Sequence, residues 1–207
     1  MSALSLALTL VAAAAPAQGN DNVLRSYANC ATKRETPQMQ AMLDARSEAA
    51  YRSSSTEFSE DAHCGSRDEV TTAVVVASFN QDRGKLRGMV AESLLKRSAH
   101  ARQLAPLAKS AMYRADWFAM TGRIQVIDEM AMCVAAINPA GVLAVLATKP
   151  NSSAQQQAFN SLTPSLGACL AGGYQLDTKP TALRAALAEA LYHRDRDGDA
   201  ASSGKGA

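Results

Sequence analysis

The sequence predicts an all-α protein made of two similar, disulfide-closed units of about four short helices each, joined by a long helix. Three observations lead to this prediction. One helical segment occurs twice, four cysteines align between its two surroundings, and apolar residues recur at helical spacing along most of the chain. Aromatic residues make up only 5% of the sequence, so we expect a core of aliphatic side chains.

The repeated segment is residues 86–97, LRGMVAESLLKR, which recurs 97 residues later as residues 183–194, LRAALAEALYHR. Both copies place apolar residues on one side of a helix, so each predicts an amphipathic helix. The recurrence predicts an internal duplication, which fixes the architecture but not the function. Six residues are identical at matching positions: Leu86/Leu183, Arg87/Arg184, Ala91/Ala188, Glu92/Glu189, Leu94/Leu191 and Arg97/Arg194.

The resemblance extends towards the N-terminal side of each copy. Cys30 aligns with Cys133 at an offset of 103 residues, and Cys64 aligns with Cys169 at an offset of 105. Four apolar residues downstream of the first cysteine also match, namely Met39, Ala41, Met42 and Leu43 with Val142, Ala144, Val145 and Leu146. The fall in offset from 105 to 97 places about eight extra residues in the first copy, within EVTTAVVVASF. Because Val and Thr favour strands, we expect a short extended segment at residues 74–79.

The four cysteines predict two disulfides, because their spacing lacks the C-x-x-C of zinc ribbons and thioredoxin-like sites. Three connectivities are open. A duplicated unit closes most simply within each copy, which favours Cys30 with Cys64 and Cys133 with Cys169 over the two cross-copy pairings. Each loop of about 35 residues would stabilise the fold by about 3 to 4 kcal/mol on a chain-entropy estimate.

The N-terminus has the pattern of a secretory signal, with an apolar run at residues 4–15 followed by Ala15-Pro16-Ala17. The run is too short to span a bilayer, so we expect no transmembrane segment after its removal. The predicted organisation is a signal peptide (1–17), a first helical repeat (18–100), a connecting helix (101–120), a second helical repeat (121–195) and a disordered tail (196–207). The expected location is therefore periplasmic or secreted, in an oxidising compartment.

The recurring Glu92 and Glu189 are candidates for paired-carboxylate chemistry, either acid–base catalysis or metal binding between the repeats. A simpler interpretation is structural. Glu92 precedes Lys96 by four residues and Glu189 precedes His193 by four, which is the spacing of ordinary helix-surface pairs. No metal-ligand spacing, phosphate loop or nucleophile motif is present, so we expect no metal and no cofactor.

A basic region lies between residues 83 and 114, with eight basic residues against the single acidic residue Glu92. The net charge of the whole chain is only +2, so this is a local asymmetry. It predicts a candidate anion-binding set for acidic lipid or polysaccharide. The candidate residues are Arg87, Lys96, Arg97, Arg102, Lys109 and Arg114. Nucleic acid is not an expected partner, because the basic residues are not interleaved with stacking aromatics.

Together these features predict an exported, soluble helical protein of the bacterial envelope that acts by binding or as a structural component, without enzymatic activity. Two alternatives remain open. One is an anion-binding protein that uses the basic region, with an acidic envelope component or another protein as partner. The other is a hydrolase or metalloenzyme with its site at Glu92 and Glu189.

Overall fold

The computed structural model describes residues 17–60, 64, 69–170, 172, 174–176 and 178–203. Over these residues the chain forms nine α-helices and two short 3-10 helices, with no strand. The all-α prediction is therefore confirmed for the described part of the chain. The predicted signal peptide falls almost entirely on residues 1–16, which lie outside the described part of the chain.

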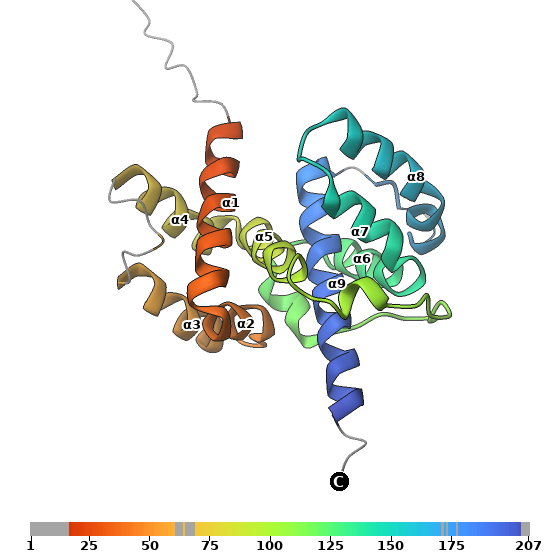
Figure 1. The fold of residues 1–207 in the computed structure, drawn as a ribbon, viewed down its shortest axis with the longest axis horizontal. Helices are drawn as coiled ribbons and strands as arrows, with labels where there is room; N and C mark the ends of the chain where they lie inside the picture. Colours follow the sequence, from red (N-terminus) through yellow and green to blue (C-terminus); the bar gives the residue numbers. More distant parts are fainter. Residues whose placement is uncertain are drawn as a thin grey trace, which may run out of the picture.

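The helices form two groups along the chain (Figure 1). The first group contains α1 (Ala17–Arg34), α2 (Thr36–Asp44), α3 (Glu48–Glu60), α4 (Glu69–Gln81) and α5 (Arg83–Leu95). The second contains α6 (Gln125–Ile137), α7 (Pro139–Ala147), α8 (Ser153–Cys169) and α9 (Pro180–Ser203). Prolines at the first turns of α2 and α7 fit helix starts, since their missing N–H groups need no partner there.

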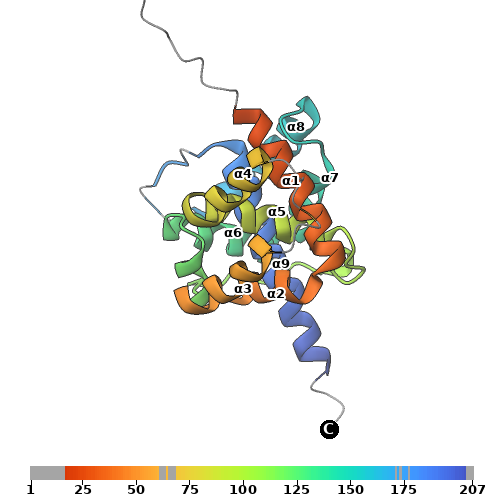
Figure 2. The same cartoon turned by 90° about the vertical axis from the view of Figure 1, so that its left-hand side faces the viewer.

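Helices α5 and α9 lie at the centre and pack against each other more extensively than any other pair. Helix α5 also contacts α1, and α9 also contacts α6. Figure 2, turned by 90°, shows α5 and α9 enclosed by the surrounding helices. Both central helices are buried almost all round their middle turns, including their charged residues. Such residues need internal partners, because an unpaired buried charge is costly.

Two disulfides close the groups. Cys30 of α1 is bonded to Cys64 beyond the end of α3, and Cys133 of α6 is bonded to Cys169 at the end of α8. Each bond therefore joins the first helix of its group to the end of the third. The favoured connectivity is confirmed, and the described residues contain no free cysteine.

The predicted connecting helix at residues 101–120 is wrong. The chain forms the 3-10 helix η1 (Ala101–Gln103), then an extended strap at residues 104–115, and then the 3-10 helix η2 (Asp116–Met120). Pro106 explains the difference: it lacks an N–H group and disfavours helical backbone at the residue before it. The amide of Leu107 instead donates to the carbonyl of Ala136 at 2.9 Å.

The predicted extended segment at residues 74–79 is also wrong, because these residues lie within α4. Val75 and Phe79 of this helix are buried, and the Phe79 ring lies edge-on to Tyr27 of α1, with 6.4 Å between ring centroids. Packing against α1 outweighs the modest strand preference of Val and Thr.

The predicted disordered tail at residues 196–207 is corrected over its first part, since α9 continues to Ser203. Two contacts support this extension. The Asp195 carboxylate lies 2.7 Å from Nδ1 of His100, and Arg196 lies 4.0 Å from the carboxylate of Asp44. Residues 204–207 are outside the described part of the chain.

Candidate functional site

The crossing of α5 and α9 is the most extensive contact between the two groups of helices. Gly88 of α5 lies against Ala185 of α9, and a Cβ atom at Gly88 would come within 2.3 Å of the Ala185 Cβ. Only glycine permits this approach without moving the helices apart. The close crossing brings the charged residues on either side of it within reach of the opposite helix.

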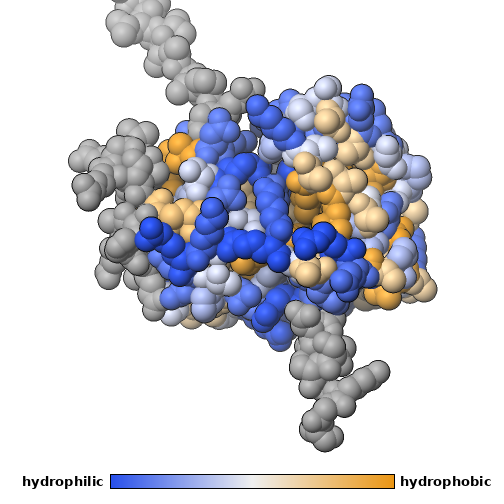
Figure 3. Space-filling view, viewed as in Figure 1, coloured by the Kyte–Doolittle hydropathy of each residue, from blue (hydrophilic) through white to orange (hydrophobic). Residues whose placement is uncertain are grey.

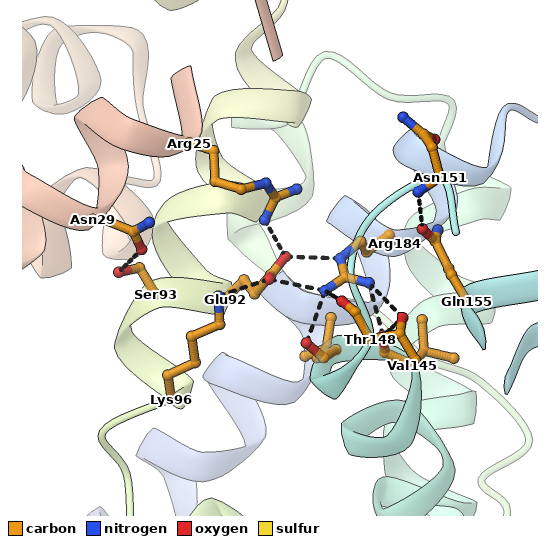
Figure 4. A network of polar contacts seen from close by, with 11 residues as sticks. Arg25, Asn29, Glu92, Ser93, Lys96, Val145, Thr148, Asn151, Gln155 and Arg184 are labelled. Carbon is orange, nitrogen blue, oxygen red and sulfur yellow. Dashed lines mark hydrogen bonds and ion pairs between the residues drawn. The ribbon is translucent and has the colours of Figure 1, made fainter. Parts of the chain in front are cut away.

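On one side of the crossing, Arg184 of α9 forms a two-pronged ion pair with Glu92 of α5 (Figure 4). Arg184 Nε and Nη2 each donate to a different carboxylate oxygen of Glu92 at 2.9 Å. The same guanidinium donates to the carbonyls of Val145 at 2.7 Å and Leu146 at 2.8 Å, at the end of α7. Arg184 and Glu92 are each only 2% exposed. The arginine therefore caps α7 and neutralises a buried carboxylate at once.

Two further cations reach Glu92 from outside (Figure 4). Arg25 Nη1 of α1 donates to Glu92 Oε2 at 2.9 Å, and Lys96 Nζ lies 3.1 Å from Oε1. Burial alone would raise the pKa of Glu92, but the hydrogen bonds and charges of Arg184 and Arg25 outweigh it and lower the pKa to about 2. Glu92 is therefore ionised at neutral pH and has no proton to donate.

On the other side of the crossing the roles of the helices are exchanged. Arg87 of α5 donates through Nε to Oε1 of Glu189 on α9 at 2.7 Å. Its remaining nitrogens donate to the carbonyls of Met42 at 2.5 Å and Leu43 at 2.7 Å, near the end of α2. Arg87 and Glu189 are both fully buried, at 0% exposure. Each central helix thus supplies an arginine to one ion pair and a glutamate to the other.

Glu189 also has a second arginine partner, which comes from the segment before α6. Arg123 donates to Glu189 Oε2 and, through Nε, to Asp128 Oδ1 at 2.6 Å. Burial favours the neutral form of Glu189, yet the charges of Arg87 and Arg123 hold its pKa below the usual range. At Asp128 burial prevails over the nearby arginine and raises the pKa.

These contacts correct the interpretation of Glu92 and Glu189 as exposed helix-surface pairs. The Glu92 to Lys96 contact exists, but both glutamates are buried, and arginines from the opposite helix dominate their surroundings. Their carboxylates lie in two separate ion-pair networks, and no hydrogen bond between described residues joins these networks. General acid catalysis needs a protonated group that is accessible to a substrate, and neither carboxylate meets that need.

The candidate anion-binding residues are dispersed. Arg87 is buried in its ion pair and does not belong to the surface, so its place in the set is corrected. Lys96 contacts Glu92, and Arg97 is bonded to the backbone oxygen of Thr32 at 2.7 Å. The remaining three residues, Arg102, Lys109 and Arg114, are exposed on or beside the strap.

One open depression on the surface contains polar groups at the lower end of α9. Trp117 stacks on His193 with 4.3 Å between ring centroids and 13° between the ring planes, and Asp44 lies 3.9 Å from His193 Nδ1. Burial lowers the pKa of His193 to about 4, so the ring is neutral at pH 7. Trp117 is only 7% exposed and packs as part of the interior rather than as an open stacking platform.

Sequence reasoning missed Arg25, Arg123 and Asp128 as members of the central networks. Asp128 gave a signal that could have identified it, because it lies on the face of α6 that also carries the buried Ala131 and Ala135. A charged residue on a buried helix face requires a partner. Arg25 and Arg123 gave no such signal, since surface arginines are common.

Within the described residues, no group of three or more His, Cys, Asp or Glu side chains is placed to hold a metal ion. No single helix in this part of the chain is both long and apolar enough to cross a membrane. The consecutive helices α6 and α7 reach that threshold only when taken together, and the chain bends by 106° between them. Comparisons of the sequence and structure with protein-family models, with curated proteins and with solved structures give no match.

Proposed function

We propose that this chain is an exported, non-enzymatic protein of the cell envelope that acts by binding or as a structural component. The observation that carries the proposal is the commitment of Glu92 and Glu189 to buried arginines. The sequence had singled out these two residues as the candidate catalytic or metal-binding pair. Their geometry suits stabilisation of the fold, and it leaves recognition to the protein surface.

The two disulfides support export. Disulfides persist in oxidising compartments and are rare in the reducing cytosol. The two disulfides join cysteines that are 34 and 36 residues apart in the sequence. The apolar run at residues 4–15 and the small residues after it give an independent reason to expect secretion.

We also infer that the two helix groups arose by internal duplication, with α1, α2, α3 and α5 matching α6, α7, α8 and α9. Equivalent contacts support this inference. Arg87 bonds the carbonyls of Met42 and Leu43, and Arg184 bonds those of their aligned counterparts, Val145 and Leu146. Helix α4 has no counterpart, which agrees with the eight extra residues of the first copy.

Two more pairs of contacts follow the same correspondence. Arg97 donates to the carbonyl of Thr32, and its counterpart Arg194 donates to the carbonyl of Ala135. Ala135 follows Thr32 by 103 residues, which is the offset of the first aligned cysteine pair. The crossing point also follows the correspondence, since Gly88 and Ala185 are 97 residues apart. This pattern is what two copies related by an approximate twofold axis would produce, because each then supplies the same residue to the other.

Carbodiimide labelling of carboxylates, read by mass spectrometry, tests the structural role of the two glutamates. We expect Glu92 and Glu189 to be modified only after unfolding in urea. Asp116, whose side chain is 73% exposed, is the matched control and should be modified in the folded protein. Rapid labelling of either glutamate in the folded protein would instead favour a solvent-accessible site and the enzyme alternative.

A non-reducing peptide map of the protein from its host's exported fraction tests the compartment. The proposal predicts a mature N-terminus near Gln18, with both disulfides intact. Recovery of the protein only from the cytosol, with reduced cysteines, would contradict export.

A further inference from the structure

The strap is an exposed part of the surface that the central networks do not use. Every residue from 105 to 112 is exposed. Three hydrogen bonds to the body hold the strap: the Leu107 amide donates to the carbonyl of Ala136 at 2.9 Å, Lys109 Nζ donates to the carbonyl of Ala168 at 2.5 Å, and Arg194 of α9 donates to the carbonyl of Ala105. In Figure 1 the strap reaches the lower right edge of the molecule, below α6 and α8. It is therefore a fixed projection from the surface.

The tip of the strap is closed by its own hydrogen bonds. The Ser110 amide donates to the Tyr113 hydroxyl at 2.9 Å, and the Ser110 hydroxyl donates to the Met112 carbonyl at 2.8 Å. This closure leaves two large apolar side chains in solvent, Leu107 at 58% exposure and Met112 at 60%. A tip that is already ordered loses little conformational entropy when it binds.

The charge of the strap has one sign. Arg102, Lys109 and Arg114 are all exposed, and the sequence contains no Asp or Glu between residues 98 and 115. Among the described residues, Arg102 and Arg114 take part in no ion pair. Figure 3 shows hydrophobic and hydrophilic residues side by side along the lower right edge of this face. Apolar and cationic side chains are therefore presented together.

We propose that the strap docks the protein onto an anionic phospholipid surface. Leu107 and Met112 would enter the boundary between headgroups and acyl chains, while Arg102, Lys109 and Arg114 meet the lipid phosphates. Interfacial binding of this kind combines buried apolar area with attraction to anionic lipid. This inference names a partner for the binding role proposed above, and it rests on that role.

The shape of the strap favours a lipid surface over an acidic protein. A stable protein partner requires a broad complementary face, usually about 800 Å² on each side. The strap instead offers a narrow projection with apolar residues near its tip and cations on both flanks. Such a projection can enter the headgroup region of a lipid bilayer. The negative charge there is spread over many headgroups, so the cations of the strap need no partners at fixed positions.

Sedimentation with lipid vesicles tests the proposal on the exported form of the protein. Vesicles of equal parts phosphatidylglycerol and phosphatidylcholine are compared with pure phosphatidylcholine, at low and at physiological salt. We expect binding to the anionic vesicles only, weakened by salt. Each cation near an anionic surface increases the partition coefficient onto vesicles about fivefold. Removing two cations, in Arg102→Gln with Arg114→Gln, should therefore reduce the partition coefficient by about 30-fold. Leu107→Ser should reduce it by about tenfold, through the loss of apolar burial.

Matched variants elsewhere on the surface serve as controls. Lys149→Gln with Lys179→Gln removes two exposed charges, and Ile124→Ser removes an apolar side chain that is 72% exposed. These variants should bind anionic vesicles like the unmodified protein. Equal binding by the strap variants and the controls would overturn the proposal, as would equal binding to both lipid compositions. Absence of vesicle binding together with strap-dependent capture of a purified acidic protein would refute the lipid partner and leave the binding role intact.

Discussion

Replacement of Arg87 by Met tests whether the buried ion pairs hold the two helix groups together. The substitution keeps an unbranched apolar stem but removes the guanidinium that joins Glu189 to the carbonyls of Met42 and Leu43. Removing one partner of a buried ion pair lowers the free energy of unfolding by about 3 to 5 kcal/mol, since the remaining charge stays buried without its partner. Arg123 still pairs with Glu189 and reduces the cost, while the two abandoned carbonyls add to it. We expect a loss of about 3 to 5 kcal/mol.

This loss is a large part of the 5 to 15 kcal/mol by which domains are usually stable. Urea denaturation of the oxidised protein, followed by circular dichroism, measures it directly. The matched control is Arg46→Met, which removes an exposed arginine whose side chain is 75% accessible and should cost at most about 1 kcal/mol. An effect of Arg87→Met no larger than that of Arg46→Met would refute the reasoning.

Three further predictions concern the crossing, the buried histidine and the second disulfide. Gly88→Ala should destabilise the fold by at least 2 kcal/mol in thermal melts, because the new methyl group meets the backbone of α9. The control Gly167→Ala, which places its methyl group in open space beside α8, should be neutral or stabilising in the same melts. Burial lowers the pKa of His193 from 6.5 to about 4, so the unfolded chain binds more protons between these values. The free energy of unfolding should therefore fall by about 3 kcal/mol as the pH decreases from 6.5 to 4, and His193→Phe should remove that part of the pH dependence in denaturation at matched pH. The paired change Cys133→Ser and Cys169→Ser should cost about 3 to 4 kcal/mol in the same assay, and a loss below 1 kcal/mol would contradict a constrained loop.

The sequence was informative where one local pattern decides the outcome. Helical periodicity predicted the all-α fold, and the aligned cysteines predicted the disulfide connectivity. The same approach failed where a competing signal was overlooked or outweighed. Pro106 ends the helix predicted between the groups, and the burial of Phe79 makes a helix of a segment rich in Val and Thr.

The role of the central charges could be predicted only in part. Recurrence of Arg87 and Glu92 as Arg184 and Glu189 indicated a structural contact in both halves, but spacing along one helix suggested partners on the same helix. The partners come from the opposite helix because α5 and α9 cross closely at Gly88. Such pairing depends on tertiary packing between segments about 100 residues apart, which helical periodicity alone does not encode.

Native-state hydrogen exchange is the most direct test of the claim that α5 and α9 form a shared centre for both groups. The central amides of both helices should be the slowest to exchange, with the same opening free energy, equal to that of global unfolding. Destabilisation by Arg87→Met should lower this value equally in both helices. If the amides of α9 exchange readily while α1 and α5 stay protected, the two groups are independent domains and the claim is contradicted.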